Sequence, residues 1–168
     1  MPRNIELKAR STDWNRQLAA ARSFGEKGTL LVQHDTFFEC ANGRLKLREE
    51  RGFPSRLIHY SRADTAKARA STYSIAPVPE PAKMRKVLSD ALGRKETVRK
   101  KRTLFLYGPT RIHFDEVPGL GRFLELEVVM KKGQPQSEGK RIARMWMDRL
   151  SIKDGDIQAT AYADLLQG

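Results

Sequence analysis

The sequence predicts an α+β protein whose centre is a closed antiparallel β-barrel of about eight strands, with helices packed outside and charged side chains inside. Two observations lead to this fold class. Segments in which apolar and polar residues alternate, as they do in strands, far outnumber segments with the period of a helix. In five of these segments the polar face consists almost only of ionisable side chains, which is unusual for a face that only meets water.

The composition suits a basic globular protein. The chain has 168 residues, and we expect a single domain over residues 1–168. Its 32 lysines and arginines outnumber 20 aspartates and glutamates, and the net charge of +12 favours anionic partners. No apolar run approaches the roughly 20 residues that cross a bilayer, so no membrane partner is expected. Because Cys40 is the only cysteine, a disulfide within the chain is excluded, and we expect a cytoplasmic protein.

The alternating segments define the predicted strands. The first, NIELKAR, sets Ile5 and Leu7 on one face and Glu6 and Lys8 on the other. Glycine, proline and asparagine in the short turns favour hairpins, and hairpins pair strands antiparallel. The predicted strands cover residues 4–10, 29–40, 43–50, 55–62, 71–78, 96–107, 110–117 and 121–132.

Three segments are predicted to be helices: residues 12–24, 81–93 and 137–150. Asp13 is suited to cap the first helix, and Pro81 to open the second. In the third, apolar residues that include Trp146 fall at helical spacing, which is typical of a helix that covers a core. The tail, residues 161–168, is expected to dock back onto the body.

The charged faces form rows at every second position. A β-sandwich with these rows in water is one explanation. The predicted helices favour a second explanation, a closed barrel. Their apolar faces need an apolar sheet face to cover, so the apolar face of the sheet is outside and the charged rows line the interior. The rows are Glu6, Lys8 and Arg10; Arg44, Lys46 and Arg48; Lys100 and Arg102; Arg111, His113 and Asp115; and Glu125 and Glu127.

A charged interior requires a charged ligand, because burying unpaired ions costs several kcal/mol each. Arginine side chains match phosphate oxygens bidentately, and paired carboxylates supply the oxygen ligands that Mg²⁺ or Mn²⁺ prefers. A chain of phosphates joined to carboxylates through a divalent cation fits both signs of charge.

Four segments resemble one known family. NIELKAR, GRLKLR (residues 43–48), TRIHFDEVPGLGRFLELE (residues 110–127) and AYADLL (residues 161–166) are similar to the CYTH domain of the triphosphate tunnel metalloenzymes, especially the branch near class IV adenylate cyclases. The resemblance implies an eight-stranded barrel that forms a tunnel, in which a triphosphate and a divalent cation bind. It also implies an enzyme, either a phosphohydrolase or an adenylate cyclase, that acts on inorganic triphosphate or a nucleoside triphosphate.

The resemblance also implies roles for individual residues. Glu6, Glu125 and Glu127 correspond to ligands of Mg²⁺ or Mn²⁺, and with Asp115 they form the expected catalytic set. Tyr162 lies in a segment expected to close one tunnel mouth, and His113 has either a phosphate contact or a structural role. The expected triphosphate cradle comprises Lys8, Lys46, Arg48, Arg62, Lys100, Arg102 and Arg111.

Asn4 departs from the family pattern of Glu-x-Glu-x-Lys in the first strand. An amide oxygen can ligate a metal but brings no charge, so a non-catalytic module that binds polyphosphate or nucleotides is the alternative function. No nucleobase-reading signature separates hydrolase from cyclase. Nucleic acid is not expected as a partner, because the basic run at residues 83–102 has no aromatic residue for stacking, and outer-face binding is the least favoured alternative. A homodimer is compatible with the sequence.

Overall fold

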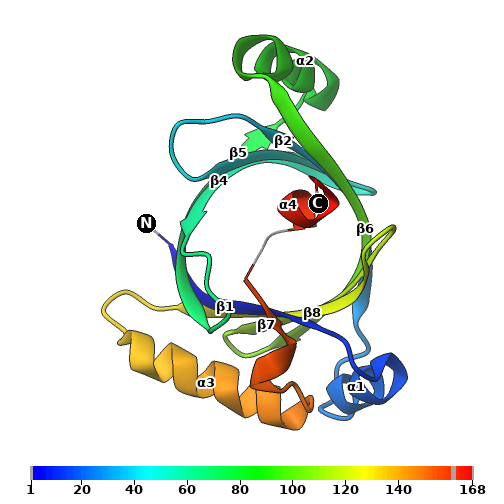
Figure 1. Cartoon of the computed structure of the whole chain (residues 1–168), viewed down its shortest axis with the longest axis vertical. Coiled ribbons are helices and arrows are strands. Elements are labelled where there is room, and N and C mark those ends of the chain that lie inside the picture. Colours follow the sequence, from blue (N-terminus) through cyan, green and yellow to red (C-terminus); the bar gives the residue numbers. More distant parts are fainter. Residues whose placement is uncertain (1, 160–161, 168) are drawn as a thin grey trace.

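Eight antiparallel strands form a closed barrel in the computed structural model, which describes residues 2–159 and 162–167. The neighbours follow the order β5-β4-β3-β2-β6-β7-β8-β1, and β1 pairs back with β5 (Figure 1). This closure confirms the predicted eight-stranded barrel. The strands are β1 (Arg3–Arg10), β2 (Thr29–Phe38), β3 (Arg44–Glu50), β4 (Phe53–Arg62), β5 (Arg69–Val78), β6 (Arg94–Tyr107), β7 (Thr110–Val117) and β8 (Gly121–Met130).

A ninth short strand, β9 (Ile157–Gln158), lies at the seam of the barrel and was not predicted. The first half of β1 pairs with β5, from Arg3 opposite Thr72 to Glu6 opposite Arg69. Beyond the start of β5, Lys8 and Ala9 pair with β9 instead. The short strand therefore supplies hydrogen-bond partners to the part of β1 that β5 does not reach.

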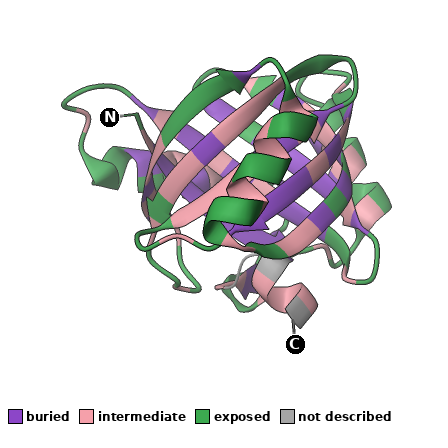
Figure 2. Ribbon diagram, turned by 90° about the horizontal axis from the view of Figure 1, so that it is seen from above, coloured by how far each residue is buried: buried purple, intermediate pink, exposed green. Residues whose placement is uncertain are grey.

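The three predicted helices are present: α1 (Trp14–Arg22), α2 (Pro81–Leu92) and α3 (Gln136–Arg149). The Asp13 carboxylate caps α1 by accepting a hydrogen bond from the backbone of Arg16. All three lie outside the barrel, whereas the helix α4 (Tyr162–Gln167) lies across one of its ends (Figures 1 and 2). The tail thus docks as expected, although residues 161 and 168 fall outside the described part. None of the described helices has the length and apolar character needed to cross a membrane.

The main hydrophobic core lies outside the barrel, between its wall and the helices. Ile5 and Leu7 of β1 are each 1% exposed and belong to the same buried cluster as Trp146 of α3. A smaller cluster, around Phe38 and Leu47, lies under α2. Because these contacts bury the apolar face of the barrel wall against the helices, the charged face lines the interior, as predicted.

Gly139 of α3 lets this helix approach the wall closely. A Cβ atom added there would lie 2.6 Å from Cγ1 of Ile5 and 2.5 Å from Sδ of Met130. We expect Gly139→Val to lower the free energy of unfolding by about 1–3 kcal/mol, because an extra side chain overpacks this contact. Urea unfolding measures the change, and Gly155→Val is the matched control because Gly155 has open space around it. Equal stability of both variants would contradict the close packing.

Candidate functional site

The barrel encloses a cavity of about 460 Å³ that is open to solvent. Of the predicted site residues, all described by the structure, Asp115 is missing from its lining. It lies on the same inward face of β7 as His113 and is fully buried, in contact with Arg102 and Tyr162. Arg10 belongs to the charged row of the first strand but was given no role in the predicted site. It is exposed and lies at the rim of the barrel. The predicted residues that line the cavity are Glu6, Lys8, Lys46, Arg48, Arg62, Lys100, Arg102, Arg111, His113, Glu125, Glu127 and Tyr162.

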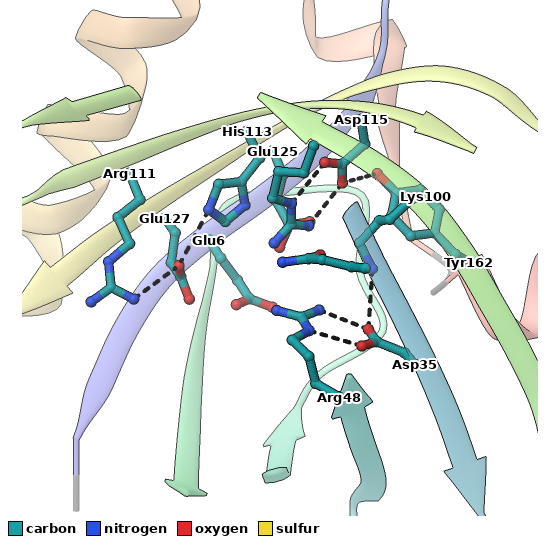
Figure 3. Close-up of polar contacts among 12 residues, drawn as sticks. Glu6, Asp35, Arg48, Lys100, Arg111, His113, Asp115, Glu125, Glu127 and Tyr162 are labelled. Carbon is teal, nitrogen blue, oxygen red and sulfur yellow. Dashed lines mark hydrogen bonds and ion pairs between the residues drawn. The ribbon is translucent and has the colours of Figure 1, made fainter. Parts of the chain in front are cut away.

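Asp35 of β2 is the centre of the cationic side of the cavity. Nε and Nη2 of Arg48 donate to its two oxygens at 2.8 and 2.7 Å, and Nζ of Lys100 donates at 3.1 Å (Figure 3). Nζ of Lys46 lies 3.3 Å from the same carboxylate. Burial alone would raise the pKa of Asp35, but Arg48, Lys100 and Lys46 hold it well below its ordinary value. One carboxylate therefore holds three members of the expected cradle in place.

Sequence reasoning missed Asp35, although a signal was present. Aspartate is disfavoured in strands, and in β2 it shares a face with Leu31, Gln33 and Phe37. A lone carboxylate on a mostly apolar face indicates a buried partner. The partner's identity depends on the neighbouring strands, because Arg48 lies directly opposite Asp35 only in the register of β2 with β3.

A second chain of contacts joins α4 to the cradle. Arg102 donates to both oxygens of Asp115 at 2.7 and 2.8 Å, and Oη of Tyr162 donates to Oδ2 of Asp115 at 2.9 Å (Figure 3). Nζ of Lys8 lies 3.6 Å from the centre of the Tyr162 ring, a cation–π contact. Asp115 thus orients Arg102 on the inner face of the barrel, and Tyr162 closes that end of the cavity.

The carboxylate side of the cavity is formed by β1 and β8. Glu6 and Glu127 lie directly opposite each other in the register of these strands. Glu6 accepts hydrogen bonds from Nη1 of Arg62 at 2.9 Å and from Oγ of Ser71 at 3.1 Å. The amide of Asn4 donates to Oε1 of Glu127 at 2.6 Å. Asn4 therefore stabilises the charge of Glu127 where a fourth carboxylate would repel it.

This side of the cavity fits a divalent cation in its donor chemistry. Burial raises the pKa of Glu127, and the charges of Glu125 and Glu6 raise it further, so the three carboxylates are close enough to repel one another. The buried Oδ1 of Asn4 has no hydrogen-bond partner among the described residues. Within the same part of the chain, no three His, Cys, Asp or Glu side chains are already arranged around a metal. Glu6 is instead paired with Arg62.

His113 lies between the two sides of the cavity and is neutral near pH 7. Burial and the charge of Arg102 lower its pKa to about 3. Its Nε2 is 3.9 Å from Oε2 of Glu127, and Arg111 approaches the same oxygen to 3.8 Å (Figure 3). Glu125 lies nearby, and although burial opposes it, Arg102 and other cations lower the pKa of Glu125. These contacts link the carboxylate side to the cradle.

The two charged sides lie across the cavity from each other. In the closed order of strands, β3 with Lys46 and Arg48 is four places from β8 with Glu125 and Glu127. A ligand that spans the cavity therefore meets Lys46 and Arg48 on one flank and Glu125 and Glu127 on the other. Cations such as Arg102 and Arg111 lie beside these carboxylates. This arrangement is suited to a polyphosphate whose charge is shared between cationic side chains and a bound cation.

Comparison with known proteins gives a match to one family. A family model described as the CYTH domain matches residues 2–162. No curated protein matches the chain.

Several solved structures have a similar fold. The PH1012 protein from Pyrococcus horikoshii has a TM-score of 0.86 and 22% identity, covering 96% of this chain and 98% of its own. A protein from Vibrio parahaemolyticus, described as a candidate adenylate cyclase, has a TM-score of 0.79 and 15% identity, covering 98% of both chains. A Hippeastrum protein described as having a dominant triphosphatase activity has a TM-score of 0.67 and 15% identity, covering 99% of this chain and 94% of its own. These likenesses establish a shared fold.

Proposed function

Because the chain belongs to the CYTH domain family, we propose that its barrel is a triphosphate tunnel and that the protein is a divalent-metal-dependent triphosphate phosphohydrolase. The observation that carries this proposal is the facing of two charged flanks across one cavity, with Lys46 and Arg48 on one and Glu125 and Glu127 on the other. The triphosphatase activity described for the Hippeastrum protein agrees with hydrolysis.

In the proposed reaction, the triphosphate lies among the cradle cations. Arg48, Lys100 and Arg102 are held by Asp35 and Asp115, so they are oriented before the ligand arrives. Their charges stabilise negative charge that develops on the transferred phosphoryl group and the leaving phosphate. Glu6, Glu125 and Glu127 would hold Mg²⁺ or Mn²⁺, which when bound supplies further charge neutralisation. A carboxylate of this set is suited to orient the attacking water.

The test is phosphate and pyrophosphate release from inorganic triphosphate, ATP, GTP and thiamine triphosphate, each with Mg²⁺ or Mn²⁺ and with a chelator control. We expect phosphate release that stops when the metal is removed. Cyclic AMP with pyrophosphate would instead indicate a cyclase. Silence with every substrate, together with no effect of triphosphate on thermal stability, would exclude the tunnel function.

A non-catalytic binding module is the second candidate, and the environment of Glu6 and Asn4 favours it. Arg62 and Ser71 occupy both oxygens of Glu6, and Asn4 contributes no charge. This candidate predicts that inorganic triphosphate raises the melting temperature while none of the triphosphates is turned over.

The affinity for triphosphate is expected to depend on pH through Lys46. Burial and the charge of Arg48 lower the pKa of Lys46 to about 7 in the empty barrel, although Asp35 opposes the shift. A lysine with a lowered pKa is charged below that pH and neutral above it, so affinity weakens as the pH rises from about 6 to about 8.5. The loss for this one group approaches tenfold per pH unit above about 7.

Calorimetry of inorganic triphosphate with a chelator present measures this dependence. Lys46→Arg is the control, because arginine stays protonated throughout this range. The ligand's own titration acts on both proteins, so the comparison isolates Lys46. Parallel pH profiles for the two proteins would contradict the assignment.

A further inference from the structure

One side of the open mouth of the cavity is apolar. Phe53, Ile75 and Leu106 line the cavity and are 50%, 48% and 55% exposed. They belong to the strand ends opposite α4, because antiparallel pairing brings the start of β4 together with the ends of β5 and β6. Side chains that continue this surface inward are Leu31, Ile58, Tyr73 and Leu104. We name these seven residues the apolar arc.

The apolar arc faces a polar half of the same mouth. It belongs to β5, β4, β2 and β6, which are contiguous in the barrel apart from β3 between β4 and β2. At β3 the apolar surface is interrupted by Glu50, which accepts hydrogen bonds from Arg56 and Gln33. The remaining strands β7, β8 and β1 bring Arg111, Glu127 and Asn4 to this end. A ligand at the mouth therefore has a hydrocarbon surface on one flank and the carboxylate side on the other.

Inorganic triphosphate leaves the apolar arc without a partner, since it has no apolar surface. The cavity of about 460 Å³ falls within the range of roughly 300–1,000 Å³ that holds ligands of the size of organic cofactors. Large half-exposed apolar side chains at the rim of such a cavity are typical of a surface that a ligand covers.

We propose that the ligand is a triphosphate monoester whose organic group is aryl or aliphatic, and that this group packs against the apolar arc. The inference rests on the proposed triphosphate function and specifies its substrate class. The arc is continuous with the charged interior, so a triphosphate held among Arg48, Lys100 and Arg102 directs its ester group toward the open mouth. The group that covers the apolar arc is then the organic group esterified to the end of the phosphate chain.

The rim side chains discriminate between ligands by how much apolar surface the ester group buries against them. Phe53, Ile75 and Leu106 carry no hydrogen-bonding group, whereas recognition of a nucleobase edge depends on donors and acceptors. An apolar group of modest size that is covered here gains about five- to tenfold in affinity. The protein should therefore prefer triphosphate esters that carry an apolar group over esters that lack one.

The experiment compares phenyl triphosphate with methyl triphosphate, which have the same charged chain, by calorimetry with a chelator present. We expect the wild-type protein to bind the phenyl ester about five- to tenfold more tightly. The double variant Phe53→Ser, Leu106→Ser should remove this preference and leave the affinity for methyl triphosphate and inorganic triphosphate unchanged. Leu30→Ser and Val87→Ser are matched controls, because these side chains are 61% and 60% exposed outside the cavity lining.

Equal affinity of the wild-type protein for the two esters would overturn the inference and leave the triphosphate function standing. Failure of inorganic triphosphate and both esters to bind would instead reject the proposed function itself. If the Phe53 and Leu106 substitutions convert a dimer into a monomer in sedimentation and leave the ester preference intact, the arc is a contact between two copies of the chain, and the inference is also wrong.

Discussion

Replacing Asp35 by asparagine is expected to lower the free energy of unfolding by about 3–5 kcal/mol, because three buried cations lose their common counter-charge. Asp35 is 1% exposed and accepts both donors of the Arg48 fork, so its loss leaves buried cations without their charged partner. The asparagine keeps the shape of the side chain, and the loss therefore reports on charge.

Urea unfolding with and without inorganic triphosphate measures this effect. The ligand should stabilise Asp35→Asn more than the wild-type protein, because its phosphates take the place of the missing carboxylate. Asp90→Asn is the control: Asp90 pairs with Lys86 on the exposed face of α2, and its loss should cost no more than about 0.5 kcal/mol. Wild-type stability of Asp35→Asn would show that the cradle does not depend on this carboxylate.

Glu127→Gln is expected to reduce metal-dependent turnover by about 100-fold or more while preserving the stability of the empty barrel. Burial and the charges of Glu125 and Glu6 raise the pKa of Glu127, so removing its charge relieves repulsion. A glutamine oxygen can still accept the hydrogen bond from Asn4. This variant should therefore lose activity while keeping its stability.

Phosphate release and urea unfolding, measured on the same preparation, check this expectation. Glu116→Gln serves as the control, because Glu116 pairs with Arg122 on the exposed surface. Undiminished turnover by Glu127→Gln would remove this residue from the metal site. A large loss of stability would mean that its charge is needed to hold the fold.

Much of the fold was predictable because a strand has a period of two. In NIELKAR, the alternation places Ile5 and Leu7 together on one face and Glu6 with Lys8 on the other, and both faces are observed. Glycine, proline and cap residues marked the ends of the elements, as Asp13 does for α1. The short strand β9 and the helix α4 carried too little periodicity to be predicted.

The candidate site was predictable as a set of side chains but not as a set of contacts. The predicted cradle and carboxylates do line one cavity, apart from Asp115. Their partners were not foreseen: Asp35 and Lys100 are 65 residues apart in the sequence and meet only because β2 and β6 pair. The pairing of Asn4 with Glu127 depends likewise on strands from opposite ends of the chain.

The sequence by itself determined which residues share a face, that one face is charged, and that the turns favour antiparallel hairpins. Only the tertiary structure decided which charge neutralises which, how α4 closes one mouth, and that Phe53, Ile75 and Leu106 meet at the other. The physical reason is that side-chain alternation is local, whereas ion pairs and cavity walls depend on the register and closure of distant strands.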